Sequence, residues 1–199
     1  MSRNLSHTAT WRRRIGVAAA IAVVAIAAPA SANATIVERG SYEGGFEETI
    51  EICGLEIHHT VEFSGWYRIR EGKNRSDDAF FLSDHYSALD TFTNLDNGKY
   101  LTISHDGVIQ DIKATRVDGS IFEFVTHEVG QPYVVRDMNG RVVLRDRGAI
   151  AVTYLFDTLG DDVPGGVWIE DLDVRISGPH PGWFLTPEDE CAGLVDLVG

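Results

Sequence analysis

Apolar and polar side chains alternate between Cys53 and Phe63, and this pattern restricts the possible folds more than any other feature. One set of positions reads Cys53, Leu55, Ile57, His59, Val61 and Phe63, and the positions between them read Gly54, Glu56, His58, Thr60 and Glu62. Because successive side chains of a β-strand point to opposite faces, the pattern predicts a strand with one buried face. Gly65 predicts a bulge or bend, after which residues 66–70 continue the alternation.

Turn signals recur along the rest of the chain, because Asn-Gly and Asp-Gly tolerate the positive φ angles of tight hairpins. Expected reversals lie at residues 71–74, 96–98, 106–107, 118–119 and 139–140. The β-branched and aromatic segments between them predict strands at 80–94, 99–105, 108–117, 120–129, 133–136, 141–146, 150–157 and 167–177. This spacing predicts an all-β fold, an antiparallel meander that forms a sandwich or a small barrel.

Two further segments frame the predicted strands. Thr186 is an expected N-cap and Pro187 suits the first helical position, so a short C-terminal helix is predicted to carry Cys191 back to the first strand. Residues 35–48, with several glycines and acids, are expected as a loose lead-in. A single all-β domain is then expected over residues 49–199.

The first 34 residues predict a secretory signal peptide. Three arginines precede an apolar run at residues 15–28, and small residues then offer A-x-A cleavage after Ala32 or Ala34. This run of 14 residues is shorter than the ~20 needed to span a bilayer. We therefore expect a secreted, extracellular protein with no stable membrane anchor after cleavage.

The formal net charge of the sequence is −13. Residues 1–34 hold four arginines and no acid, so the charge becomes −17 once they are removed. Such an acidic chain repels phosphate backbones, which excludes nucleic acid as an expected partner.

The sequence contains two cysteines, Cys53 and Cys191. In an exported chain an even number of cysteines predicts pairing, so we expect a disulfide between them. No histidines lie at zinc-finger spacing, and the acidic loops do not follow the calcium-loop pattern. Ser64 does not lie in a nucleophile elbow. No catalytic residue, metal ligand or cofactor is therefore predicted.

A weaker signal comes from polar residues beside aromatic ones. The candidate ligand site consists of His59, Trp66, Asp84, His85 and Tyr86. His59 lies on the apolar face of the first predicted strand, where a buried, hydrogen-bonded histidine is a better interpretation than a base or ligand. His105 precedes a predicted turn and is interpreted as a residue that flanks it.

Several short motifs resemble a known family. They are Cys53-Gly54, Phe80-Phe81-Leu82-Ser83-Asp84-His85, Thr91-Phe92-Thr93-Asn94, Asn97-Gly98-Lys99 and Asp189-Glu190-Cys191-Ala192. In this order they resemble an uncharacterised family of small secreted actinobacterial β proteins, with a signal peptide and one cysteine near each end of the mature chain. The resemblance implies export and one compact β domain, and it implies no activity.

Two functions remain open from the sequence. The leading hypothesis is a secreted, non-catalytic β module that binds a small molecule or a cell-surface component. The alternative is an extracellular, hydrolase-like enzyme that uses a His/Asp pair, either His85 or His59 with a nearby acid. That alternative predicts a cleft in which a histidine lies within ~3 Å of a carboxylate.

Overall fold

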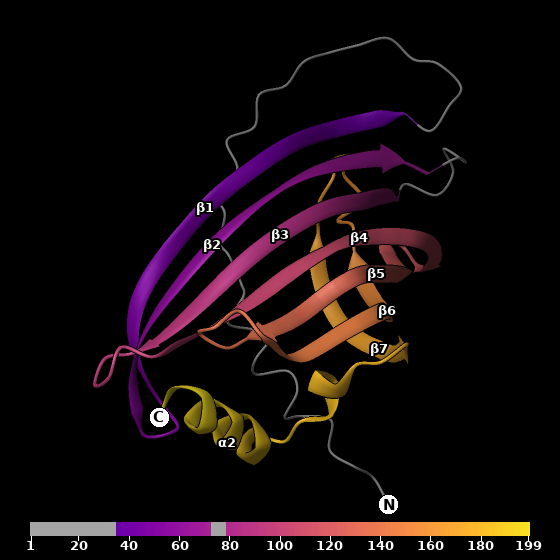
Figure 1. The fold of residues 1–199 in the computed structure, drawn as a ribbon. Helices are drawn as coiled ribbons and strands as arrows, with labels where there is room; N and C mark the ends of the chain where they lie inside the picture. Colours follow the sequence, from indigo (N-terminus) through magenta and orange to yellow (C-terminus); the bar gives the residue numbers. More distant parts are fainter. Residues whose placement is uncertain (1–34, 73–78) are drawn as a thin grey trace, which may run out of the picture. The chain divides into compact units, whose positions relative to one another are not determined.

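The computed structural model describes residues 35–72 and 79–199, which form a single curved sheet and a short helix (Figure 1). The elements are β1 (Ile36–Ile52), β2 (Leu55–Glu71), β3 (Phe80–Asn94), β4 (Tyr100–Asp118), β5 (Ile121–Arg136), β6 (Val142–Asp157), β7 (Val167–Ser177), the 3₁₀-helix η3 (Pro181–Phe184) and α2 (Pro187–Val198). Each strand pairs antiparallel with the next. The predicted all-β antiparallel meander with a short C-terminal helix is confirmed. The sheet is not closed, so β1 and β7 are its edges.

Some of the sequence predictions fall outside this part of the chain. The expected signal peptide at residues 1–34 lies outside the described residues, as does half of the expected reversal at 71–74. Within the described ranges, no helix has both the length and the apolar composition to cross a membrane.

The strands are longer than predicted. Residues 36–48, expected as a loose lead-in, lie in β1. The expected reversal at Asp106 and Gly107 lies in the middle of β4, and pairs of shorter predicted strands are joined in β4, β5 and β6. Cys53, expected in a strand, forms with Gly54 the two-residue turn between β1 and β2, with φ angles of 55° and 76°. Turn signals in this chain therefore mark both hairpin turns and bends within strands.

A row of glycines explains the bends. Gly107 pairs with Gly130, and Gly130 pairs with Gly148, so three adjacent strands carry a glycine at the same level of the sheet. Gly130 and Gly148 have φ angles of 137° and 129°, which residues with a side chain rarely adopt. Register shifts between Ser104 and Asp106 adjoin this row. Glycine kinks and bulges of this kind bend a sheet without ending its strands.

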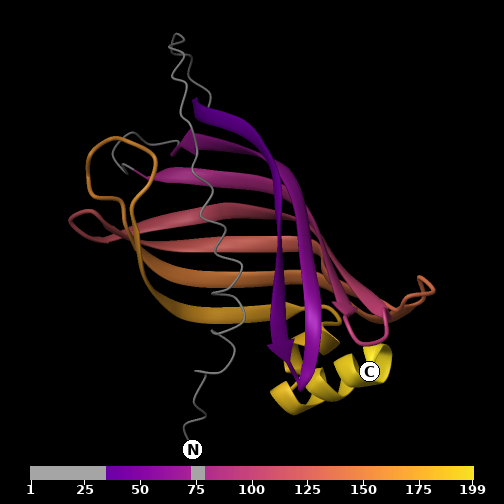
Figure 2. The same cartoon turned by 90° about the vertical axis from the view of Figure 1, so that its left-hand side faces the viewer.

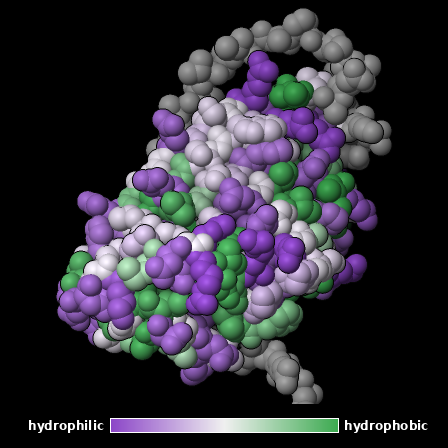
Figure 3. All heavy atoms as spheres, viewed as in Figure 1, coloured by the Kyte–Doolittle hydropathy of each residue, from purple (hydrophilic) through white to green (hydrophobic). Residues whose placement is uncertain are grey.

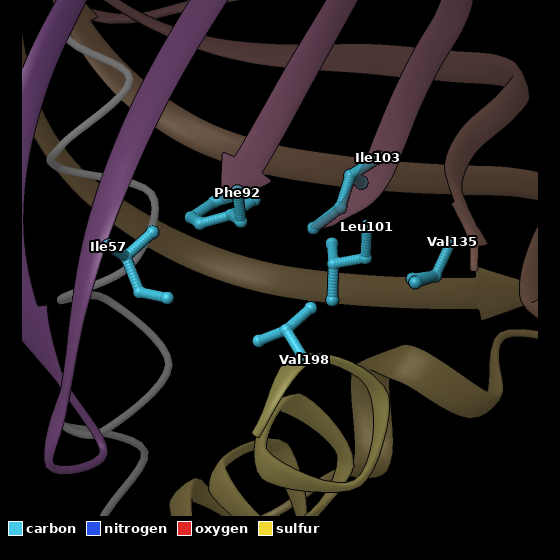
Figure 4. Packing of buried hydrophobic residues seen from close by; sticks show 6 residues of the cluster. All are labelled: Ile57, Phe92, Leu101, Ile103, Val135 and Val198. Carbon is cyan, nitrogen blue, oxygen red and sulfur yellow. The ribbon is translucent and has the colours of Figure 1, made fainter. Parts of the chain in front are cut away.

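The sheet curves around a core at its α2 end (Figures 1 and 2). Ile57 in β2 and Val135 in β5 belong to one buried cluster with Val198 of α2 (Figure 4). Phe92, Leu101 and Ile103 of β3 and β4 lie between these residues and complete the cluster, which α2 covers on the same side of the sheet. We call the face that α2 contacts the inner face and the opposite one the outer face.

A second buried cluster lies toward the ends of β3, β4, β5 and β6 that are opposite to the α2 core. It centres on Phe122 and Phe124, and Phe81, Tyr154 and Phe156 pack against it. The two clusters share no member. The surface seen in Figure 3, from the same side as Figure 1, carries hydrophilic side chains with hydrophobic ones among them.

The C-terminal helix is attached to the sheet by a covalent bond and by hydrogen bonds. Cys53 and Cys191 form the predicted disulfide, with Cα atoms 5.3 Å apart. The side chain of Asn94, which is buried, donates a hydrogen bond to the carbonyl of Val198. These contacts hold α2 against the inner face.

The helix begins with a capping box. The hydroxyl of Thr186 accepts a hydrogen bond from the backbone N–H of Asp189, and the Asp189 carboxylate accepts one from the backbone N–H of Thr186. We expect Thr186→Ala to lower the free energy of unfolding by about 1 kcal/mol, because a helix N–H loses its partner. Chemical denaturation measures this change. An unchanged midpoint would mean that α2 does not contribute to global stability.

Candidate functional site

The five residues of the candidate ligand site divide between the two faces of the sheet. Trp66 pairs with His85, and both lie on the outer face, where their rings stack with centroids 3.8 Å apart. His59, Asp84 and Tyr86 lie on the inner face, on the same side as Ile57. The structure therefore does not bring the five residues together into one site.

A chain of hydrogen-bonded side chains crosses the inner face next to the α2 core. Nε2 of His59 lies 2.8 Å from Oδ1 of Asp90, and Nε2 of His105 lies 3.0 Å from Oδ2 of the same carboxylate. At one end, Nδ1 of His59 faces Glu48 at 3.4 Å, and at the other Nδ1 of His105 donates to the carbonyl of Pro132 at 2.7 Å. This histidine–aspartate chain joins β1 through β5.

The charge on His105 follows from its partners. A carbonyl oxygen can only accept, so Nδ1 carries a proton, and Nε2 faces a carboxylate. Burial opposes the charge, but the hydrogen bond and charge of Asp90 outweigh it and raise the pKa of His105. Burial likewise acts to raise the pKa of Asp90, but hydrogen bonds from His105 and His59 lower it overall. When His105 is protonated, its imidazolium and the Asp90 carboxylate form a half-buried ion pair.

Two tyrosines of this face donate hydrogen bonds to carboxylates, and the ring of each passes over a glycine on the adjacent strand. The hydroxyl of Tyr42 donates to both oxygens of Asp84 at 3.0 Å, and its ring lies over Gly65. The hydroxyl of Tyr86 lies over Gly107 and donates to Glu128. A Cβ atom at either glycine would collide with the ring. Gly65 therefore accommodates a tyrosine, and the bulge predicted there is absent from the β2–β3 register.

Asp111 is a buried carboxylate of this face. It accepts hydrogen bonds from Thr126, from the hydroxyl of Tyr154 and from the backbone N–H of Leu82. Burial is the largest influence and raises the pKa of Asp111, as it does for Asp84. We define the inner belt as Asp84, Asp90, Asp111 and Glu128 with their hydrogen-bonding partners His59, His105, Tyr42, Tyr86, Thr126 and Tyr154.

The inner belt lies between the two apolar clusters on a concave face. Each of its four carboxylates is engaged by a phenol, a hydroxyl or an imidazole. In the described part of the chain, no three His, Cys, Asp or Glu side chains are arranged to hold a metal ion. The belt therefore offers fixed hydrogen-bonding groups that are half-buried and already oriented.

Several residues of the inner belt were not among the predicted site residues. Asp90, Asp111 and Glu128 lie within regular strands and carry no motif. His105 was interpreted as a residue beside a turn, but it lies in β4 and pairs across from Ala88. The signal that could have identified these residues is the register of the β2–β3 and β3–β4 hairpins, which places His59, Asp90 and His105 on one face.

Comparison with models of protein families, with curated proteins and with solved structures gave no match. The geometry of the site is therefore the basis for a functional proposal.

The histidine–aspartate chain predicts how stability depends on pH. The pKa of His105 is raised, so its contribution is complete below the unfolded value of ~6.5 and is lost as the pH rises through the folded value. The pKa of Asp90 is lowered, so its contribution is present above ~4 and is lost on further acidification. The raised pKa values of Asp84 and Asp111 also favour the folded state at lower pH.

We therefore expect a larger free energy of unfolding at about pH 5.5 than at about pH 8, measured by chemical denaturation. His105→Gln reduces the difference. His58→Gln, on the outer face and with 39% of its side chain exposed, is the matched control and retains it. Greater stability at the higher pH would contradict this account.

Proposed function

We propose that this chain is an exported, non-catalytic β module that binds a small polar molecule across the inner face of its sheet. One observation carries the proposal: half-buried, oriented polar side chains form a belt between two apolar clusters on a concave surface. Small-molecule sites combine these elements, with apolar walls for contact area and a few fixed polar groups for specificity. Export is supported by the signal pattern in residues 1–34 and by the disulfide.

The hydrogen bonding within the belt favours binding over catalysis. Both ring nitrogens of His105 and both of His59 face an oxygen acceptor within 3.4 Å. A histidine that removes a proton needs one nitrogen directed at the substrate. The belt carboxylates can each accept a further hydrogen bond, since a carboxylate has about four lone-pair sites. We therefore expect the ligand to carry hydroxyl or amino donors.

Native mass spectrometry of the protein tests this proposal. The complete sequence is expressed in a host that exports it, and the protein is purified from the medium. We expect additional mass that disappears on denaturation, on a polypeptide that begins after Ala32 or Ala34. Glu128→Gln on the inner face should reduce the fraction of the protein that carries the additional mass. Glu62→Gln on the outer face is the matched control and should leave that fraction unchanged. If no preparation of the protein carries additional mass, the carrier function is contradicted.

One observation favours a hydrolase-like enzyme as a second candidate. The 2.8 Å contact between Asp90 and His59 has the spacing of a base and the group that orients it. Nδ1 of His59 contacts Glu48, and this is the longest contact in the histidine–aspartate chain. The Glu48 side chain is 52% exposed. Movement of Glu48 would open Nδ1 of His59 to a substrate. The enzyme would be favoured if the wild-type protein hydrolyses an ester, carries no additional ligand mass, and loses the hydrolysis in both His59→Asn and Asp90→Asn.

A further inference from the structure

Two arginines face each other on the outer face of the β1–β2 hairpin. Arg39 pairs directly with Arg68, and both side chains are exposed. Like charges directly across a strand pair are unfavourable. Within residues 35–72 and 79–199, neither arginine side chain makes a hydrogen bond or an ion pair, although the sequence has 30 acids and 17 basic residues. The pair thus presents two cationic groups, and no acid of the described residues is paired with either of them.

An exposed aromatic surface adjoins the arginine pair. Trp66 lies two residues before Arg68 on the same face and is 45% exposed. Its indole stacks on the His85 ring at an interplanar angle of 13°. The stack fixes the orientation of the indole, and Ser41, its partner in β1, supplies a hydroxyl beside it. A flat apolar surface with polar edges therefore lies next to the two guanidinium groups.

These residues line a common hollow. It measures about 530 Å³, and Ile36, Arg39, Ser41, Trp66 and Arg68 contribute to its wall. The acids of this face of the hairpin lie toward its turn, at Glu43, Glu47, Glu51, Glu56 and Glu62. The charged side chains that line the hollow, Arg39 and Arg68, are therefore both cationic, which favours an anionic ligand.

We propose that this hollow binds an anionic saccharide, a sugar ring that carries a carboxylate or a phosphate. The C–H face of the ring stacks on Trp66, its hydroxyls reach Ser41, and the acidic group is held by Arg39 and Arg68. Guanidinium groups match the geometry of both anions, and two of them at adjacent positions can share one acidic group. The site is on the outer face and does not depend on the inner belt, so it adds a second ligand class to the proposed function.

Isothermal titration calorimetry on the purified protein tests the site. The probes are trigalacturonate for the carboxylate, glucose 6-phosphate for the phosphate, and maltotriose as the neutral control. We expect at least one anionic probe to bind and maltotriose to bind at least about tenfold more weakly, since the neutral sugar cannot make hydrogen bonds between an acid and the guanidinium groups. The tighter of the two anionic probes identifies which acid the ligand carries.

Two pairs of variants separate specific contacts from net charge. Arg39→Gln with Arg68→Gln should weaken binding of the anionic probe by at least about tenfold. Arg141→Gln with Arg175→Gln removes the same charge from exposed arginines that pair with Asp137 and Asp173, and should leave binding unchanged. Trp66→Ala should weaken the binding as well. Circular dichroism and the melting temperature verify that each variant folds.

Three results would overturn the site: no binding of either anionic probe at millimolar concentration, equal binding of maltotriose, or equal losses in the two arginine pairs. None of these results bears on the inner belt, because Glu128→Gln tests that face separately.

Discussion

Replacement of Cys53 and Cys191 by serine lowers the free energy of unfolding by about 4–5 kcal/mol, the largest effect that we expect from any change in this chain. The two residues are 138 positions apart, and a cross-link that closes so long a loop removes much of the conformational freedom of the unfolded chain. Typical domains have a total stability of ~5–15 kcal/mol, so the variant is close to unfolding. Urea denaturation of the oxidised protein and of the variant measures the difference.

Serine is the appropriate replacement because it keeps the size of the side chain and the positive φ angle of the turn at Cys53. The reduced wild-type protein serves as the control and should match the double variant. If reduction and substitution both leave the denaturation midpoint unchanged, the bond does not support the fold.

Asp90→Ala should destabilise the protein by about 2–3 kcal/mol, the second largest expected effect. Removal of this carboxylate leaves Nε2 of His105 and Nε2 of His59 in half-buried positions without their hydrogen-bonding partner. The dependence of stability on pH should decrease at the same time, because His105 loses the interaction that raises its pKa. Thermal and chemical denaturation at two pH values measure both effects.

Asp106→Ala is the matched control for Asp90→Ala. Asp106 lies on the outer face of β4, and its carboxylate accepts a hydrogen bond from Ser87 in an exposed position. We expect its loss to cost less than about 1 kcal/mol. Equal effects of the two substitutions would show that the histidine–aspartate chain has no special structural role.

Turn residues and side-chain alternation were sufficient to predict the strands for which each predicted turn is also a turn in the structure. The predicted strands at residues 80–94 and 167–177 coincide with β3 and β7. Asp-Gly at 106–107 carries the same local signal as a hairpin, but Tyr86 of the neighbouring strand needs the space above Gly107. Because that requirement comes from a residue on another strand, it cannot be read from the dipeptide itself.

The candidate site was only partly predictable for a related reason. His59 was expected to be a buried, hydrogen-bonded histidine, and its contact with Asp90 agrees with that interpretation. A bulge at Gly65 would have placed Trp66 on the same face as His59, but β2 pairs with β3 without a register shift, so the two side chains lie on opposite faces. The partner Asp90 could be found only from the register of β2 against β3, which places Val61 opposite Asp90 and His59 opposite Phe92.

The position of the helix has a consequence for how the chain folds. Each hairpin of the meander joins segments that are close in sequence, and such contacts form early because little loop entropy is lost. The core around Val198 needs β2, β3, β4 and β5 together with α2, and the cysteines that secure it are 138 residues apart. We therefore expect helix docking to be the late, slow step of folding, with the curved sheet formed before it. The disulfide would then form after the sheet, and it would mainly lower the unfolding rate.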